Sequence, residues 1–223
     1  MLLPPLPFCC MKSFVKELEV LYLDNHLLAV NKPAPLLTQP NNSNAPNLET
    51  LVKEWVKKRY KKMGRVFLHP IHRLDKPVGG IVLFARTSKA LTRLNVQIKN
   101  RAIQKTYFAQ VEGQLYPHAK TLKHNLIHGS HRAHISPLGK RALLSYTIHK
   151  TYPLYTFVEI KLYTGRYHQI RIQFAHIGHP IVGDSRYGSV ENFSHIALHH
   201  SKMVFFHPVS QERIVISSCP PFK

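Results

Sequence analysis

Residues 69–85 have the sequence HPIHRLDKPVGGIVLFA and contain the strongest structural signal in the chain. Two prolines and a glycine pair prevent the first part of this segment from forming a helix, which predicts a rigid loop. Residues 81–84 are an unbroken apolar run, as expected of a short buried strand. The segment is therefore expected to hold Asp75 on a stiff loop beside a strand.

Asp75 lies between two cations, Arg73 and Lys76, which favour its charged form. A carboxylate on a rigid loop is a suitable mounting for chemistry, because a fixed scaffold keeps reacting groups in place. The same pattern also fits a solvated loop with a structural Asp–Arg pair. Taken alone, the segment favours the structural interpretation.

The charge of the whole chain points to a polyanionic partner. The 223 residues include 31 Lys and Arg but only 11 Asp and Glu, a net charge of +20. Such an excess suits nucleic acid or an anionic membrane surface. No apolar run approaches the ~18 residues of a membrane span, and the first ten residues contain three prolines and no leading basic cluster, unlike a signal peptide. We therefore expect a nucleic-acid partner and no membrane association.

Cysteine and histidine spacing predicts no metal site. The three cysteines are Cys9, Cys10 and Cys219, which form neither a metal-ligand pattern nor a disulfide framework. This usage favours a reducing, cytoplasmic setting. The sixteen histidines include no His-Glu-x-x-His or similar spacing.

Apolar periodicity predicts many short strands and few helices. Asn47 is expected to cap a helix whose apolar face is positions 48, 51, 52, 55 and 56. Ser88, with Thr87 before it, is expected to cap a second helix that ends near Asn100. The expected strands are residues 18–22, 27–30, 81–84, 105–111, 141–150, 154–163, 203–206 and 213–216, with a strand, a turn and a helix within 164–177. This order predicts a mostly antiparallel α+β fold.

Two basic segments are candidate RNA-binding surfaces. Residues 53–76 contain nine basic and two acidic side chains, and residues 113–158 contain no acid but six Lys or Arg and six His. A run of charge is most often a solvated face, but the one-sign excess just before Asp75 favours contact with phosphates. The candidates in the first segment are Lys57, Lys58, Lys61 and Lys62.

Four segments in this order resemble the RluA-type family of RNA pseudouridine synthases. His72-Arg73-Leu74-Asp75, followed by glycine and an apolar strand, resembles the catalytic motif of the family. VLYLDNHLLAVNKP at 20–33 resembles its opening hairpin, KTY at 105–107 its tyrosine motif, and TGRYHQIR at 164–171, continuing to GHPIVGD at 178–184, its arginine motif. The resemblance implies one catalytic domain at 18–223 with a bent, mixed, mostly antiparallel sheet flanked by a few helices. Residues 1–17 are expected to form an arm, too short for the separate N-terminal RNA-binding domain that many members of the family carry.

The implied reaction is the isomerisation of specific uridines in ribosomal RNA or tRNA to pseudouridine, without a cofactor, by a monomer. The base would have to leave its stack to be reached. By resemblance, Asp75 is the essential carboxylate, acting by covalent addition or by removal of a ribose proton. Arg171 is expected to pair with Asp75, and Tyr107 to stack on the uracil and help remove the proton from its carbon 5.

Further residues are expected to contact the RNA. Arg73 is predicted to fill the gap left by the flipped base, Lys32 to contact phosphate, and Arg166 and His168 to bind RNA. Two departures from the family pattern are Lys76-Pro77-Val78-Gly79 after the Asp, where Arg-Asp-Thr-Ser is commoner, and Gln39-Pro40, where His-Pro is common.

The alternative function is a non-catalytic, basic RNA-binding or ribosome-associated protein with a structural Asp75. The charge of the chain cannot separate the two functions, because both require it. Convergence of Asp75, Tyr107 and Arg171 in one cleft can distinguish the two functions, since a protein that only binds RNA has no need of it. A hydrolase with paired carboxylates is disfavoured, because no other acid lies close to Asp75 in the sequence.

Overall fold

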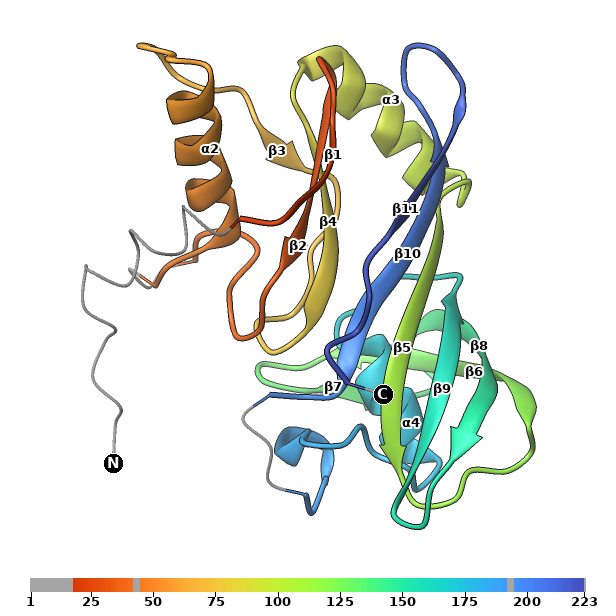
Figure 1. Ribbon diagram of the computed structural model, residues 1–223. Helices are drawn as coiled ribbons and strands as arrows, with labels where there is room; N and C mark the ends of the chain where they lie inside the picture. Colours follow the sequence, from red (N-terminus) through yellow and green to blue (C-terminus); the bar gives the residue numbers. More distant parts are fainter. Residues whose placement is uncertain (1–17, 42–44, 192–194, 223) are drawn as a thin grey trace.

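The computed structural model describes residues 18–41, 45–191 and 195–222, so the predicted arm at 1–17 lies outside the described residues. Within these ranges, strands from both ends of the chain join one sheet, with helices against it (Figure 1). The helices are α2 (Leu48–Arg59), α3 (Ser88–Lys99) and α4 (Gln169–His176), with a short 3-10 helix η1 (Ser185–Tyr187). The strands are β1 (Val20–Leu23), β2 (Leu27–Lys32), β3 (His69–Pro70), β4 (Gly79–Ala85), β5 (Gln104–Glu112), β6 (Ala119–His128), β7 (Ala133–Ile135), β8 (Lys140–Thr151), β9 (Tyr155–Leu162), β10 (Leu198–Phe206) and β11 (Arg213–Ser217).

The sheet confirms the mixed, mostly antiparallel α+β prediction. Its strand order is β1-β2-β4-β10-β5-β9-β8-β6-β7, with β11 on β10 and β3 on β4. Among the described strands, β4 and β10 are the one parallel pair, and they share only two residue positions. The sheet is thus narrowly joined at its centre, between the half that contains β4 and the half that contains β5.

The glycine pair belongs to this junction. The sequence predicted Gly79 and Gly80 as part of the loop, but both lie in β4, so that prediction is wrong. Gly80 has a positive φ of 113°, and a Cβ there would lie 2.4 Å from the backbone oxygen of His200 on β10. Glycine is therefore required at position 80 for β4 and β10 to approach each other. The Gly79-Gly80 pair reflects this close approach of two strands and not a turn.

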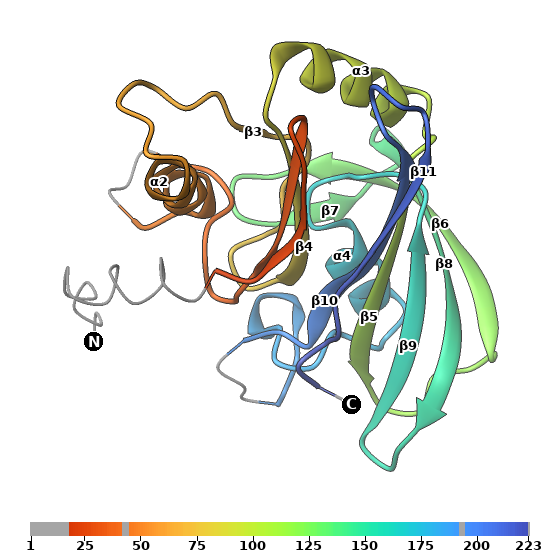
Figure 2. The same cartoon turned by 45° about the horizontal axis from the view of Figure 1, so that its top comes forward.

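Two helices bury opposite faces of β2 and β4 (Figure 2). Leu28 and Val30 belong to the apolar cluster that includes Leu48, Leu51, Val52 and Val56 of α2. The alternate residues Leu27 and Ala29 belong to the cluster that includes Ala90 and Leu94 of α3. Because successive strand residues point to opposite faces, β4 and residues 27–30 of β2 are apolar without interruption.

The helix termini follow their capping residues. Asn47 accepts a hydrogen bond from the backbone N–H of Thr50 at 3.0 Å, as predicted. The second helix is capped by Thr87, whose hydroxyl accepts from the N–H of Ala90 at 3.2 Å, while Ser88 is the first helical residue. The prediction of Ser88 as the cap was therefore wrong by one position.

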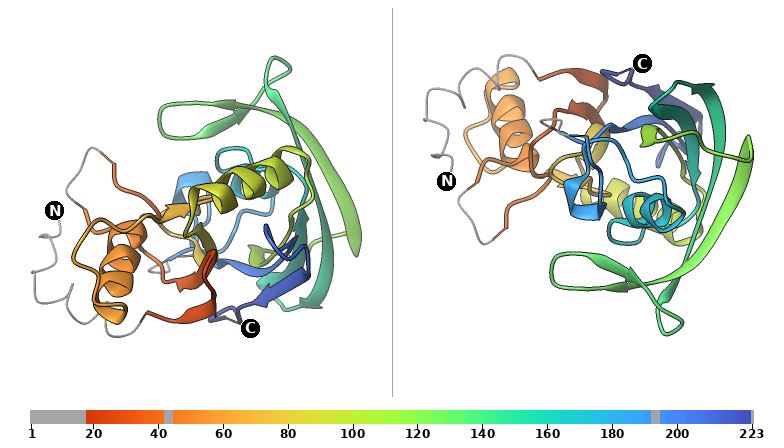
Figure 3. Two further views of the ribbon diagram at one scale, coloured as in Figure 1. Left: turned by 90° about the horizontal axis from the view of Figure 1, so that it is seen from above. Right: turned by 90° about the horizontal axis from the view of Figure 1, so that it is seen from below.

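The other half of the sheet curves around α4 (Figure 3). Ile170 and Phe174 of α4 belong to the same apolar cluster as Leu144 and Ile160 of β8 and β9, and the ring of Phe174 packs 5.5 Å from that of Tyr146. This packing fixes the N-terminal end of α4, which carries the arginine motif.

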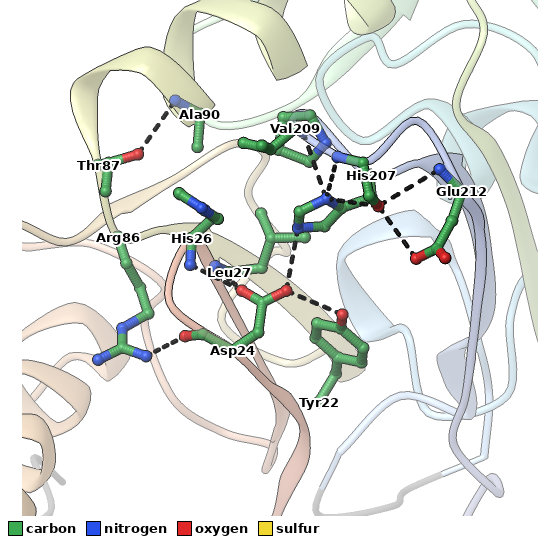
Figure 4. Close-up of polar contacts among 12 residues, drawn as sticks. Tyr22, Asp24, His26, Leu27, Arg86, Thr87, Ala90, His207, Val209 and Glu212 are labelled. Atoms are coloured by element: carbon green, nitrogen blue, oxygen red, sulfur yellow. Dashed lines mark hydrogen bonds and ion pairs between the residues drawn. The ribbon is translucent and has the colours of Figure 1, made fainter.

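A polar cluster joins the β1–β2 turn to the β10–β11 turn (Figure 4). Asp24 accepts backbone hydrogen bonds from His26 and Leu27, both at 2.7 Å, and one from the Tyr22 hydroxyl at 2.9 Å. Nε2 of His207 lies 3.0 Å from the same carboxylate. Nδ1 of His207 accepts from the backbone N–H of Ser210, which leaves the ring proton on the nitrogen that faces Asp24. Asp24 thus ties two distant hairpin turns together.

Asp24→Ala is expected to lower the free energy of unfolding at neutral pH by about 2 kcal/mol, because buried donors lose a charged acceptor. Burial would raise the pKa of Asp24, but the hydrogen bonds and His207 lower it below its ordinary value. The contribution of Asp24 is therefore present above about pH 4 and is lost as pH falls through the folded-state pKa.

Urea unfolding of wild type and Asp24→Ala at several pH values measures this contribution. Glu54→Ala, which removes an exposed carboxylate on α2, is the control. A difference in unfolding free energy that did not shrink at acid pH would contradict the assignment to the Asp24 carboxylate.

Candidate active site

A cavity of about 630 Å³ lies between the two halves of the sheet. Its walls are the loop that follows β3, the C-terminal end of α3, the start of β5 and residues 162–171. Asp75, Tyr107 and Arg171 all line it. The prediction that these three side chains meet in one cleft is therefore confirmed.

The loop that carries Asp75 is held from both sides. The hydroxyl of Thr38 accepts from the N–H of Leu74 at 3.0 Å and donates to its carbonyl at 2.8 Å. The carbonyl of Lys76 accepts from the N–H of Leu36 at 3.0 Å, and the N–H of Val78 donates to the carbonyl of Asp75. These contacts account for the predicted rigidity of the loop.

Lys32 is buried and links this loop to the segment that follows β2. Its side chain is 1% exposed, and its ammonium donates to the carbonyls of Pro33, Leu36 and Lys76. All three ammonium protons thus have acceptors, so the predicted phosphate contact is corrected to a structural one. Burial lowers the pKa of Lys32 to about 7, although the Asp75 carboxylate opposes this shift.

Arg171 is fixed by a carboxylate that the sequence did not single out. Its Nε and Nη2 donate to the two oxygens of Asp184 at 2.6 and 2.8 Å, and Nη1 donates to Asp75 at 3.1 Å. Arg171 and Asp184 are 4% and 1% exposed, respectively. Burial would lower the pKa of Arg171, but Asp184 and Asp75 raise it, so the guanidinium stays charged. Asp184 therefore holds Arg171 while one N–H is directed at Asp75.

Tyr107 lines the same cavity as Asp75 and Arg171. It lies on β5, is 6% exposed, and stacks on the ring of His200 from β10 at 4.5 Å. Burial raises the pKa of Tyr107, and the charge of Asp75 adds to this, so the phenol is neutral in the free protein. Its position agrees with a ring that contacts a base placed beside Asp75.

His168 was predicted to bind RNA. It lines the cavity but is only 7% exposed, and its ring contacts Asp75 and Tyr187. Its Nε2 is 3.6 Å from the carboxylate, and its Nδ1 is 2.9 Å from the hydroxyl of Tyr187. Because that hydroxyl already accepts from the backbone N–H of Ala133 at 2.8 Å, its own proton is available to Nδ1. The ring proton then sits on Nε2, facing Asp75.

The remaining predicted RNA contacts divide into two groups. Arg73 and Arg166 are exposed and line the cavity, as contacts to RNA at its rim require. The four lysines at 57, 58, 61 and 62 are also exposed but do not line the cavity, because they lie at and beyond the C-terminal end of α2. Contact between these lysines and RNA outside the cavity stays a prediction.

In the part of the chain that the structure describes, no group of three or more His, Cys, Asp or Glu side chains could hold a metal ion. Over the same residues, no helix is long and apolar enough to cross a membrane. The arrangement instead offers a partly exposed carboxylate, a neutral phenol and a fixed guanidinium around one space. Such a site can hold a nucleoside with its glycosidic bond at Asp75 and its base against Tyr107.

A model of the RNA pseudouridylate synthase family matches residues 26–176. The uncharacterized RNA pseudouridine synthase YhcT of Bacillus subtilis (strain 168) is 34% identical over 209 residues, which cover 89% of this chain and 67% of that protein. The tRNA pseudouridine synthase C of Pasteurella multocida (strain Pm70) is 33% identical over 224 residues, covering 89% of this chain and 90% of that protein. Ribosomal large subunit pseudouridine synthase D of Xylella fastidiosa (strain Temecula1) is 33% identical, and the chain spans 62% of its length.

Two solved human structures share the fold. Human RNA pseudouridylate synthase domain containing 1 has a TM-score of 0.77 and 22% identity, and the match covers 94% of this chain and 86% of that one. Human RNA pseudouridylate synthase domain containing 4 has a TM-score of 0.79 and 18% identity, and the match covers 96% of this chain and 92% of that one. At these identities, the similarity is one of fold alone.

Proposed function

The chain belongs to the RNA pseudouridylate synthase family and is thus an isomerase of uridines in RNA, and we propose that Asp75 is the carboxylate that carries out its reaction. The observation that supports this proposal is the convergence of Asp75, Tyr107 and Arg171 in one cavity. A protein that only binds RNA has no need of a buried arginine held by one carboxylate and directed at a second. Convergence therefore favours the enzyme over the non-catalytic alternative.

In the proposed reaction, the target uridine leaves its stack and enters the cavity, a rearrangement that costs a few kcal/mol. Arg73, at the rim, fills the space that the base leaves. The bond between uracil N1 and the ribose breaks, the base turns, carbon 5 bonds to the ribose, and the proton from carbon 5 is removed as N1 gains one. The overall change is an isomerisation, so no co-reactant is consumed.

Each side chain has a distinct role in this proposal. Asp75 acts at the ribose, by covalent addition or by removal of a ribose proton, and both routes need an ionised carboxylate. Arg171 favours that charged form, and Tyr107 packs on the uracil. His168 directs an N–H dipole at the same carboxylate and so orients it.

The proposed substrates are ribosomal RNA or tRNA, because the similar proteins include a tRNA pseudouridine synthase and a ribosomal large subunit pseudouridine synthase. The proposal includes a cytoplasmic monomer that needs no cofactor and a single catalytic domain at 18–223. A transcriptome-wide pseudouridine map from cells with and without the protein tests it. At least one uridine should lose its modification in the absence of the protein, and identical maps would reject the proposal.

His168→Gly is expected to slow pseudouridine formation roughly tenfold, about 1.4 kcal/mol in barrier, because Asp75 loses the N–H that faces it. The fold should tolerate this change, since His168 has a φ of +51° that glycine adopts without strain. Burial lowers the pKa of His168 to about 4, Asp75 opposes this, and Arg171 and Arg186 add to it, so the ring is neutral at pH 7.

Initial rates on total RNA from cells that lack the protein, with thermal unfolding measured alongside, check this expectation. His168→Ala is the comparison, because it also removes the ring but keeps the backbone strain. It should be as slow as His168→Gly but less stable. A His168→Gly protein with the wild-type rate would show that only the backbone matters at this position.

RNA affinity should fall log-linearly with salt, because the exposed lysines at 57, 58, 61 and 62 release counterions from phosphates. Changing all four to alanine should reduce the slope by about 0.7 to 0.9 for each phosphate contact that is lost, the values for single-stranded and duplex nucleic acid. Filter binding of total tRNA across a salt series measures the slope. A Lys89→Ala variant, exposed on α3, is the control, and an unchanged slope in the quadruple variant would mean that this face is only solvated.

A further inference from the structure

A second cavity, of about 490 Å³, opens beside the candidate active site. It is lined by residues 126–128 at the end of β6, residues 138–140 at the start of β8, and residues 165–167. Residues 165–167 and His128 also line the first cavity. The two cavities therefore adjoin, and a strand bound in the first can extend over this shared wall into the second.

The lining combines apolar surface with positive charge. Leu138 is 91% exposed and Ile127 is 39% exposed, so neither residue contributes to the core. Lys140 and Arg166 are exposed beside them, and neither an Asp nor a Glu lines the cavity. An apolar patch among cations suits a nucleotide, whose base is flat and apolar on its faces and whose phosphate is an anion.

The walls of this cavity are held in place. The ring of Tyr167 lies between His168, stacked at 3.7 Å, and His128, at 4.1 Å. A Cβ on Gly139 would lie 2.5 Å from the backbone nitrogen of Leu126, so glycine lets the 138–140 segment lie directly against β6. Arg186 donates to the carbonyl of His131 at 2.9 Å and fixes the β6–β7 hairpin from the other side. The cavity is therefore formed before any ligand binds.

We propose that the second cavity binds the base of a nucleotide that flanks the target uridine in single-stranded RNA, with Lys140 and Arg166 at its phosphates. The proposal rests on the proposed function, because the first cavity must hold the target uridine. The volume of the second cavity lies within the roughly 300–1,000 Å³ of small-ligand sites, which is enough for a base and its sugar. The subsite would make modification depend on an unpaired nucleotide next to the target, with little preference for which base it carries, because every base has an apolar face.

Binding of a fluorescent oligouridylate, and of an abasic ribose-phosphate chain of equal length, tests the inference. Leu138→Ser should weaken oligouridylate binding roughly fivefold, because the base loses the apolar surface that the leucine covers, and leave the abasic chain unaffected. Lys140→Ser should weaken both and lower the salt slope by about 0.7. Leu154→Ser, which changes a leucine that is 71% exposed in the turn between β8 and β9, is the matched control and should change neither.

A Leu138→Ser protein that binds oligouridylate as the Leu154→Ser control does would overturn the inference. Equal losses for oligouridylate and the abasic chain would overturn it as well, because they would mean that no base is bound there. Pseudouridine formation by the wild type in total RNA is measured in the same preparations. Failure of the proposed function is then seen as an inactive wild type, whereas failure of this inference is seen as an active wild type with base-independent binding.

Discussion

Asp75→Asn is expected to abolish pseudouridine formation while the protein stays folded. The amide has nearly the shape of the carboxylate but can neither add to the ribose nor take a proton from it. Loss of a group that reacts directly typically costs several orders of magnitude in rate, beyond the sensitivity of most assays. The fold should be little affected, because Arg171 keeps both of its hydrogen bonds to Asp184. We expect the free energy of unfolding to change by about 1 kcal/mol or less.

The variant should bind RNA at least as well as the wild type, since a negative charge that faces a polyanion has been removed. Purified variant and wild type would be incubated with total RNA from cells lacking the protein, and pseudouridine would be read by a uridine-selective chemical block to reverse transcription. Glu54→Gln, an exposed carboxylate on α2, is the control for loss of one charge. Normal pseudouridine levels from Asp75→Asn would show that another group carries the reaction.

The position of Asp75 could be predicted because its signal is local. Prolines and an apolar run specify a loop and a strand whatever surrounds them, and the structure has both. The convergence with Tyr107 and Arg171 was expected only through the resemblance to a family. No periodicity places residues from β5 and α4 beside that loop, because long-range packing decides it.

The predictions for Lys32 and His168 failed for a single reason. A basic residue near an RNA site is expected to face phosphate, but side-chain direction depends on the tertiary partner. Lys32 is surrounded by carbonyls and His168 by Asp75 and Tyr187, so both are inside the protein. Their contribution is to hold the loop and the carboxylate in position.

Three strands, the two-residue β3 and the longer β6 and β7, were not predicted. In β6 only Leu122 and Leu126 are buried, and most of the other side chains are exposed on both faces. The sequence therefore lacks the alternation that identifies a half-buried strand. The same exposure leaves the last residues of β6, 126–128, free to form one wall of the second cavity.

Asp184 entered the predictions only as the last residue of the arginine motif. Asp184→Ala is expected to have the largest effect on stability of the changes considered. It removes two charged hydrogen bonds from Arg171, a residue that is 4% exposed. Breaking a buried ion pair by removing one partner costs about 3–5 kcal/mol, and here the buried charge keeps only the single hydrogen bond to Asp75. For a chain of this size, that is a fall in Tm of roughly 10 °C.

Asp184→Ala should also lower the rate of pseudouridine formation, for a reason that is separate from the loss of stability. Without Asp184, the guanidinium of Arg171 has Asp75 as its one hydrogen-bonded carboxylate, so it can pair more tightly with Asp75 and compete with substrate for that oxygen. We expect a decrease in rate of about a hundredfold at temperatures where the variant is folded, comparable to the loss of one preorganised donor.

A double variant separates the two effects. Asp184→Leu combined with Arg171→Met replaces the pair by apolar side chains of similar volume, which in other buried pairs is neutral or stabilising. It should recover most of the lost unfolding free energy, measured by urea denaturation, but none of the pseudouridine formation. Asp184→Asn, which keeps one acceptor, should lie between wild type and Asp184→Ala in both measurements. A single Asp184→Ala variant that lost less than about 1 kcal/mol would mean that water reaches Arg171 and that the pair is not the anchor of the site. A double variant that regained activity together with stability would remove Arg171 from the proposed mechanism and leave Asp75 to act without it.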